Sequence, residues 1–407
     1  MVETTIAKKI IICAVIACVI CVHMPVINAG EVDILVQKLV DKGILSPVEA
    51  QTILDETKIG VKEEIANVES YGSPTWAQRI ALKGDLRTRY QYSNTDGNDP
   101  EVRHRGRLRL RLGAIAKVNE QLEVGFGFAT GENSDPRSTN LTLRNDFSKE
   151  GIYLDYAYAK YMPFDWAEVI GGKMKNPLWT PSDLLWDSDI NPEGAALNLN
   201  IDVNENIKAF MNNAFFIMDE SSSNNNEPTM FVFQPGVEMV VDNLEFKTAG
   251  TLYATNDAKG YAQDWSAGSN NKGNYNWICL AGGAELGMNF DKEGLIPYAG
   301  IFGEGVLNID SEDPGFLFGA KIGDKKVKTF GDWQLKGSYR YLERNSWIDS
   351  YPDSDAWGGA TDVKGLEGIL EMGLMDNVIL SLDYYRMAAI QDGAKEDIFQ
   401  VDVSYKF

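Results

Sequence analysis

The stretch RHRGRLRLRLG, residues 103–113, places arginine at every second position and leucine between the last of them. The arginines are Arg103, Arg105, Arg107, Arg109 and Arg111. Successive side chains of a β-strand alternate between two faces, so these arginines would form one ladder opposite Leu108, Leu110 and Leu112. A helix would spread the same charges around its surface. The stretch therefore predicts a strand with one charged face and one apolar face.

The length of this pattern indicates a membrane strand. The arginine ladder would be about 27 Å long at the rise of a strand. The apolar band of an outer-membrane barrel is about 25 Å tall, whereas a soluble strand usually has only about 5–6 residues. An arginine on the lipid side costs about 2–4 kcal/mol near the bilayer midplane. We therefore expect the leucines to face lipid and the arginines to face a wet interior.

The first 29 residues have the layout of a secretory signal peptide. Lys8 and Lys9 precede an apolar run, and Ala29 provides a small residue for cleavage. An alternative is lipoprotein cleavage at Cys18, which leaves an apolar remnant on the mature chain. A retained spanning helix is disfavoured because the run is short and contains Pro25. The pattern predicts an exported protein.

Composition excludes several classes of function. The chain has a formal net charge of −21, and loss of two lysines and one glutamate with the signal peptide makes it one unit more negative. Such a balance disfavours nucleic acid as a partner. Cys279 and His104 are then the single cysteine and histidine, which excludes an intramolecular disulfide and the usual histidine-based catalytic and zinc sites. We expect no enzyme activity and no cofactor.

Residues 30–75 have helical rather than strand periodicity. Ser46 is a strong N-cap, Pro47 suits the first helical position, and Glu49 completes a capping box. We expect a short helical segment in the periplasm. Its apolar stripe fits packing of two helices on each other, self-association, or a periplasmic partner.

From Ile80 onward the apolar residues recur at every second position, as in strands. We interpret residues 76–407 as an all-β transmembrane barrel of about 16 antiparallel strands. Short turns alternate with long polar loops, which is typical of outer-membrane barrels. The expected strands are residues 82–92, 102–117, 122–129, 151–161, 166–174, 195–201, 206–218, 229–241, 244–255, 275–290, 295–307, 315–324, 333–343, 362–374, 378–388 and 397–407.

The first and last of these strands carry further signals. Lys83, Arg87 and Arg89 lie on one face of the first strand and extend the predicted basic pore lining. The chain ends DIFQVDVSYKF, with apolar residues at alternate positions before a terminal phenylalanine. Val403, Tyr405 and Phe407 thus resemble the C-terminal signal that the barrel-assembly machinery recognises.

Taken together, these features resemble the putative porin family of Gram-negative bacteria. The resemblance rests on the leader, the segment VQKLVDKGILSPVEAQTIL, the strand pair GDLRTRYQY and RHRGRLRLRLG, and the central GGKMKNPLWTPSDLLWDSDINPEGAALNL. It implies a porin fold in the outer membrane lipid, a water-filled channel for passive diffusion of small hydrophilic solutes, and a homotrimer. An anion-preferring, substrate-selective channel and a non-conducting scaffold remain alternatives.

Residues 175–194 form the third external loop, the one that narrows the channel in porins generally. Trp179, Leu184 and Trp186 could anchor this loop to a wall. Its acidic residues are Asp183, Asp187, Asp189 and Glu193. Our hypothesis is that these carboxylates, with inward Glu238, Glu245 and Glu285, face the arginine ladder across a constriction. Such a field would orient dipolar solutes; alternatively, the arginines only brace the barrel through ion pairs.

One short motif in this loop suggests calcium. Asp187, Asp189 and Asn191 are spaced like the start of a calcium-binding loop. The sequence lacks glycine at the sixth position and glutamate at the twelfth, where Asn198 stands. Calcium is therefore an alternative to the main expectation of no metal.

Overall fold

The computed structural model describes residue 42 and residues 77–96, 101–132, 134–144, 146–220, 227–259, 266–270, 275–291 and 294–407. The chain divides into two compact units, Met1–Arg79 and Ile80–Phe407. The predicted signal peptide lies outside the described residues. So does the predicted helical segment of residues 30–75, apart from Lys42, which is in a turn.

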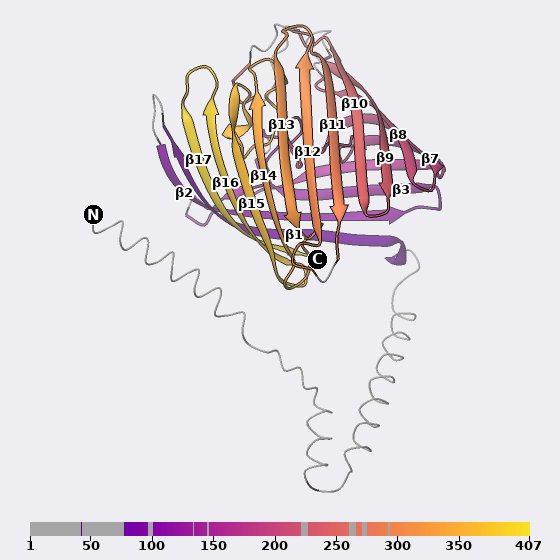
Figure 1. Cartoon of the computed structure of the whole chain (residues 1–407), viewed down its shortest axis with the longest axis horizontal. Helices are drawn as coiled ribbons and strands as arrows, with labels where there is room; N and C mark the ends of the chain where they lie inside the picture. The colour runs from indigo at the N-terminus through magenta and orange to yellow at the C-terminus, as the bar shows by residue number, and fades with distance from the viewer. Residues whose placement is uncertain are drawn as a thin grey trace, which may run out of the picture. The chain divides into compact units, whose positions relative to one another are not determined.

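The second unit is one antiparallel sheet that closes on itself. Strand β1 pairs with β2 on one side and with the C-terminal strand β17 on the other, and Figure 1 shows the yellow final strands meeting the indigo first strand. The strands are β1 Ile80–Thr95, β2 Glu101–Lys117, β3 Leu122–Thr130, β4 Leu141–Thr142, β5 Ile152–Phe164, β6 Ala167–Lys173, β7 Glu193–Asn204, β8 Ile207–Ile217, β9 Thr229–Val241, β10 Leu244–Asn256, β11 Ile278–Asn289, β12 Tyr298–Asn308, β13 Pro314–Gly323, β14 Trp333–Leu342, β15 Val363–Met375, β16 Val378–Ala389 and β17 Lys395–Lys406. Two short 3-10 turns are η2 Ala77–Arg79 and η3 Trp357–Gly359.

The sixteen-strand prediction is confirmed. Every predicted strand is present, and each of its ends lies within three residues of the predicted position. The two-residue β4 was not predicted. It lies in the connection between β3 and β5 and pairs with β2 at Arg107 and Leu108. Strand β3 is shorter and pairs with β2 only at residues 111–117.

The two faces of the sheet differ as the alternation predicts. In the register of β1 and β2, Arg89 lies beside Arg107 and Arg87 beside Arg109, so the arginines share one face. The other face carries large apolar side chains that are 36–59% exposed on β2, β3, β12 and β13, among them Leu112, Val124, Phe126, Phe128, Ile301, Phe316 and Phe318. Closure encloses the charged face and leaves the apolar face outside.

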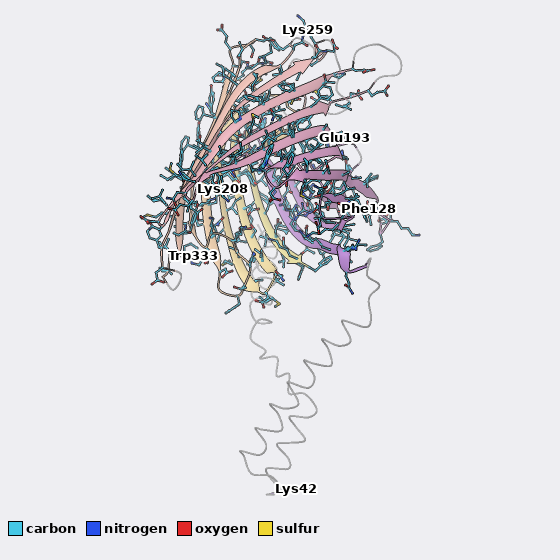
Figure 2. All side chains as sticks on the ribbon, turned by 90° about the vertical axis from the view of Figure 1, so that its right-hand side faces the viewer. Lys42, Phe128, Glu193, Lys208, Lys259 and Trp333 are labelled. Carbon is cyan, nitrogen blue, oxygen red and sulfur yellow. The ribbon has the colours of Figure 1, made fainter. Side chains whose placement is uncertain are left out.

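Long and short connections separate to the two ends of the barrel. We number the loops at the long-loop end in chain order. L2 is residues 131–151, L3 is 174–192, L5 is 257–277 and L7 is 343–362. Figure 2 shows Lys259 of L5 at one end and Lys208 and Trp333, next to short turns, at the other. Within the described part of the chain, no helix has the length and apolarity needed to cross a membrane.

Candidate functional site

Loop L3 crosses the barrel interior. At one end, the Trp179 backbone exchanges hydrogen bonds of 2.8 and 2.9 Å with Gln234 of β9. At the other end, Asp189 forms an ion pair of 2.8 Å with Arg111 of β2. Strands β9 to β12 lie roughly opposite β2 in the ring. The loop therefore spans the interior from wall to wall and narrows it.

Loop L7 packs against L3 inside the barrel. The ring of Tyr351 stacks on Trp186 with ring centroids 4.7 Å apart. The indole of Trp347 donates to the carbonyl of Leu185 at 2.7 Å, and both residues are fully buried. The backbone N–H of Asp187 donates to the carbonyl of Tyr351 at 2.6 Å. These contacts make L3 and L7 one packed unit, which we call the L3–L7 plug.

Loops L2 and L5 hold the plug in place. Arg137 of L2 donates to the carbonyls of Pro352 and Gly358 in L7. Gly359 has a φ of +74°, and a side chain there would overlap the Arg137 guanidinium, so glycine is required at this approach. Fully buried Asp349 of L7 accepts hydrogen bonds from L5. The donors are Ser266, Ser269 and Asn270.

The predicted basic ladder lies on the inner face and is paired with carboxylates. Arg87 and Arg89 of β1 share this face with the five arginines of β2. The arginine ladder thus has seven members, namely Arg87, Arg89, Arg103, Arg105, Arg107, Arg109 and Arg111. Arg89 binds Asp402 of β17 through two nitrogens at 2.7 and 2.8 Å. Asp85 of β1 binds Arg109 and Arg111, each at 2.7 Å. Strand-borne carboxylates thus neutralise part of the ladder.

Loop carboxylates neutralise another part. Asp355 of L7 contacts Arg89 at 2.6 Å and Arg107 at 3.9 Å. The ion pairs of the seven arginines involve five carboxylates, namely Asp85, Glu101, Asp189, Asp355 and Asp402. Among the described residues, Arg105 has no carboxylate within 4.0 Å. The ladder keeps a small excess of positive charge, and Lys83 adds an exposed amine near the short-turn end.

The four predicted acidic residues of the third external loop do not act together. Asp189 alone contacts the ladder, through Arg111. Asp183 instead binds Arg340 of β14 at 2.9 Å, and Asp187 accepts backbone N–H groups from Asp189 and Ser354 within the plug. Glu193 is the first residue of β7, and it is exposed and paired with Lys173. The hypothesis placed four loop carboxylates opposite the ladder across a constriction. In the structure only Asp189 reaches the ladder, and it contacts Arg111 directly.

The acidic positions on the far wall are paired as well. Glu238 binds Lys247 at 3.1 Å and Glu285 binds Lys321 at 2.6 Å. Glu245 binds Lys325. These strands do lie roughly opposite β2, as expected. Each of these three glutamates has its own lysine, whereas Glu304 of β12 accepts a hydrogen bond from Ser182 of L3.

Two aspartates of L7 have opposite ionisation. Burial raises the pKa of Asp353 well above its usual range, and the charge of Asp183 adds to this although Arg340 opposes it. Burial also disfavours ionisation of Asp355, but the guanidinium groups of Arg89 and Arg107 outweigh it and hold the pKa of Asp355 well below its usual range. The surroundings of Asp355 therefore favour its charged form, whereas those of Asp353 favour its neutral form.

A third carboxyl lies where L3 meets L7. Burial, with a smaller contribution from the charge of Asp189, raises the pKa of Asp187 to about 7. Backbone N–H groups donate to both of its oxygens at 2.8 and 2.9 Å, which limits the rise. The contact between the loops thus contains a group that titrates near neutral pH.

The three residues of the calcium-like motif do not converge. Both oxygens of Asp187 accept backbone hydrogen bonds, and the oxygens of Asp189 bind Arg111 and Thr139. The side-chain nitrogen of Asn191 donates to Asp155. In the described ranges, no group of three or more His, Cys, Asp or Glu residues could hold a metal ion.

Beside L3 lies a polar cavity of about 460 Å³. Its lining comes from L2, L3, L7 and the adjoining strands and includes Asp135, Thr139, Asp155, Lys173, Asp189, Asn191 and Tyr351. Asp189 links this cavity to the ladder through Arg111. Polar groups are therefore continuous from the loop end to the basic wall.

A closed sixteen-strand antiparallel barrel with an apolar exterior, a charged interior and inward-folded loops defines the class of porin-type outer-membrane barrels. Residues 92–282 and 278–407 match the family model described as "Putative porin". The chain belongs to this family.

The comparison with solved structures finds bacterial porins, one of which has a TM-score above 0.5. A high-pH structure of OprB from Pseudomonas putida has a TM-score of 0.54 at 10% identity, covering 81% of this chain and 95% of that chain. A multiple mutant of the Rhodopseudomonas blastica porin has a TM-score of 0.46 at 10% identity, covering 81% of this chain and 100% of that chain. No curated protein matches the sequence.

Family and fold together give the general function. The protein is an outer-membrane channel for passive diffusion of small hydrophilic solutes. The resemblance found in the sequence is thereby confirmed at the level of family, fold and general activity.

Proposed function

We propose that solutes pass between the arginine ladder and the L3–L7 plug, and that size and polarity select them more strongly than the sign of their charge. The observation that carries this proposal is the charge compensation inside the barrel. The ladder meets carboxylates of β1, β17, L3 and L7, and on the far wall Glu238, Glu245 and Glu285 are each paired with a lysine.

Paired charges on both walls act on a solute through their dipoles. Water and hydroxyl-bearing solutes can exchange hydrogen bonds with guanidinium, carboxylate and amide groups along the passage. An apolar solute would have to displace that hydration without replacing its hydrogen bonds, which is costly. The walls therefore favour small hydrophilic molecules.

A planar-bilayer recording tests this proposal. The purified protein should form water-filled channels with weak ion selectivity in a KCl gradient. The double change Arg107→Gln and Arg109→Gln should shift the reversal potential toward cations, because it removes positive charge from the wall of the passage. Arg386→Gln serves as the control, because this arginine is 61% exposed and shares the outer face of β16 with Tyr384. Absence of conductance would favour a scaffold, and unchanged selectivity in the double variant would remove the ladder from the passage.

We also propose that the protein has no enzymatic activity. His104 faces the outer side, where its ring nitrogen shares a hydrogen bond of 2.7 Å with the exposed hydroxyl of Tyr90. The charged groups inside the barrel are distributed among ion pairs rather than arranged as a nucleophile and base. Family membership supports the same conclusion.

The remaining proposals concern assembly and location. Val403 and Tyr405 lie on the outer face of β17, and the Phe407 backbone pairs with Gly84. This arrangement supports a role of the last strand as the assembly signal, which deletion of Phe407 tests through yield in the outer membrane. We propose a homotrimer, a cleaved leader and a periplasmic N-terminal segment. Native mass spectrometry and N-terminal sequencing of the mature protein test them.

A further inference from the structure

Asp355 lies among four arginines of the ladder. We call Arg87, Arg89, Arg105 and Arg107 the arginine cluster. Asp355 contacts Arg89 at 2.6 Å and Arg107 at 3.9 Å, and its charge also acts on Arg87 and Arg105. It is the one carboxylate near this cluster that comes from L7 rather than from a strand. A loop side chain thus occupies the centre of a basic site built by rigid strands.

The cluster has more hydrogen-bonding capacity than the protein itself uses. Across the sheet, Arg105, Gln91 and Gln400 form one row of β2, β1 and β17, and Arg107, Arg89 and Asp402 form the next. Gln400 is fully buried, and neither of its amide atoms has a hydrogen-bond partner among the described residues. The buried Nε atoms of Arg87, Arg105 and Arg107 also have no hydrogen-bond partner among the described residues.

Unpartnered buried polar atoms are costly unless they serve a ligand or bind water. Here the unpartnered atoms include three guanidinium N–H donors and one amide N–H₂ group, all on the wall that Asp355 contacts. Guanidinium groups bind carboxylates through forked hydrogen bonds. Because Asp402 already holds two nitrogens of Arg89, removal of Asp355 would leave Arg89 paired but would free the remaining donors.

We propose that the arginine cluster, with Gln400, is a binding site for the carboxylate group of a small organic anion, and that Asp355 is a tethered competitor for that site. A carboxylate solute that enters the barrel replaces Asp355 on Arg89 and Arg107. This inference rests on the proposed passage along the ladder, and it adds the class of solute that is retained there.

The tether explains why a channel can contain such a site without being blocked by every anion. A ligand attached through a short flexible linker competes at an effective concentration of roughly millimolar, and a side chain positioned by a packed loop competes at least as strongly. Dilute carboxylates therefore bind weakly to the natural protein. Three consecutive left-handed residues lie just beyond Asp355, namely Trp357, Gly358 and Gly359, so this part of L7 leaves the cluster in a sharp turn.

Calorimetry on the full-length mature protein in detergent tests the proposal without requiring conductance. Succinate is the carboxylate probe, with inorganic phosphate and glucose as comparators. Asp355→Asn should bind succinate about tenfold more tightly than the natural protein, because it removes the tethered competitor. Asp353→Asn is the matched control, since it changes the same loop two residues away but contacts Arg340 instead of the cluster. Its affinity for succinate should not change.

A second pair of variants locates the site. Adding Arg105→Gln and Arg107→Gln to Asp355→Asn should abolish the gain in succinate affinity, while circular dichroism shows an intact barrel. Equal succinate affinity in Asp355→Asn and the natural protein would overturn the proposal. So would phosphate binding as tight as succinate binding, or an equal gain in Asp353→Asn. Failure of the proposed channel function would appear separately, as absent conductance in bilayers with succinate binding retained.

Discussion

The two walls that L7 touches have opposite charge balance. On one side, Asp355 meets a ladder in which seven arginines share five carboxylates. On the other side, Asp353 and Asp183 both approach Arg340, and Glu367 lies 3.5 Å from the same guanidinium. Cations are in excess at the first wall, whereas at the second wall three carboxyl groups meet two cations, Arg340 and Lys336. Two aspartates separated by one residue therefore have pKa values displaced in opposite directions.

This difference shows that the loops complete the charge pattern of the strands. Asp355 supplies a full negative charge where the strands have too few carboxylates. Asp353 approaches Arg340 together with Asp183, so two loop carboxyl groups share one guanidinium that Glu367 also approaches. A plug that matches each wall in this way is held by both walls. Substitutions at each wall and within the plug can therefore separate their contributions.

The largest loss of stability is expected at the wall that contains Arg340 and Glu367. Arg340→Met would leave the buried carboxylate of Glu367 and the partly exposed carboxylate of Asp183 without their guanidinium. Breaking a buried ion pair by removing one partner costs about 3–5 kcal/mol. We expect the free energy of unfolding, measured by urea titration in lipid vesicles, to fall by about this amount. The control Lys208→Met, at an exposed pair, should change it by less than about 1 kcal/mol. Equal losses would contradict the proposed charge balance of the two walls.

The next effect concerns the aromatic contact that joins the loops. Trp347 is fully buried and contacts Trp186 and Tyr253. Truncation of such a side chain costs about 3–5 kcal/mol. Because the loss falls on the plug, Trp347→Ala should raise amide hydrogen exchange in L3 and L7 and increase single-channel conductance, while the strands stay protected.

Trp166→Ala is the matched control, since this tryptophan is 48% exposed and lies in a short turn. It should leave both readouts unchanged. Loss of protection throughout the strands of Trp347→Ala would show that the plug is not a separate unit.

A smaller effect depends on pH. Burial raises the pKa of Asp187 to about 7, above its unfolded value of 3.8. The protonated carboxyl therefore stabilises the folded plug at low pH. This stabilisation is lost as the pH rises from about 4 through about 7. Asp187→Asn should remove this slope and should be more stable than the natural protein at pH 8. Unfolding titrations at pH 4, 6 and 8 measure it. A parallel pH profile in both proteins would refute the assignment.

The smallest changes in stability and ion selectivity are expected at the paired glutamates of the far wall. Glu238 and Lys247 are 43% and 31% exposed, and exposed ion pairs contribute about 0–1 kcal/mol. Glu238→Gln should change the free energy of unfolding by less than about 1 kcal/mol. Its effect on the reversal potential should also be smaller than that of the double change Arg107→Gln and Arg109→Gln. A larger shift would mean that the far wall controls selectivity.

The barrel was predictable because its signal is local. Alternation of apolar and polar residues fixes both the strand and its two faces, and in a membrane barrel the outer face must be apolar along the whole length of each strand. The inner position of Arg105, Arg107 and Arg109 followed directly. Strand β4 was missed because two residues cannot show a period.

The partners of the ladder were not predictable in the same way. Asp355 and Asp402 are 266 and 313 residues from Arg89, and no periodicity connects residues so far apart. L7 was interpreted only as a long polar loop. One signal was present, because RNSWIDSYPDSDAW combines Trp347 and Ile348 with three aspartates, and apolar residues in a polar loop indicate that the loop is packed inside.

The central claim is that loop carboxylates compensate the basic wall of the passage, and the reversal potential of Asp355→Asn tests it most directly. In a planar bilayer with a KCl gradient, removing this one charge should shift the reversal potential toward chloride relative to the natural protein, while Asp353→Asn should not. Identical reversal potentials for all three proteins would contradict the claim.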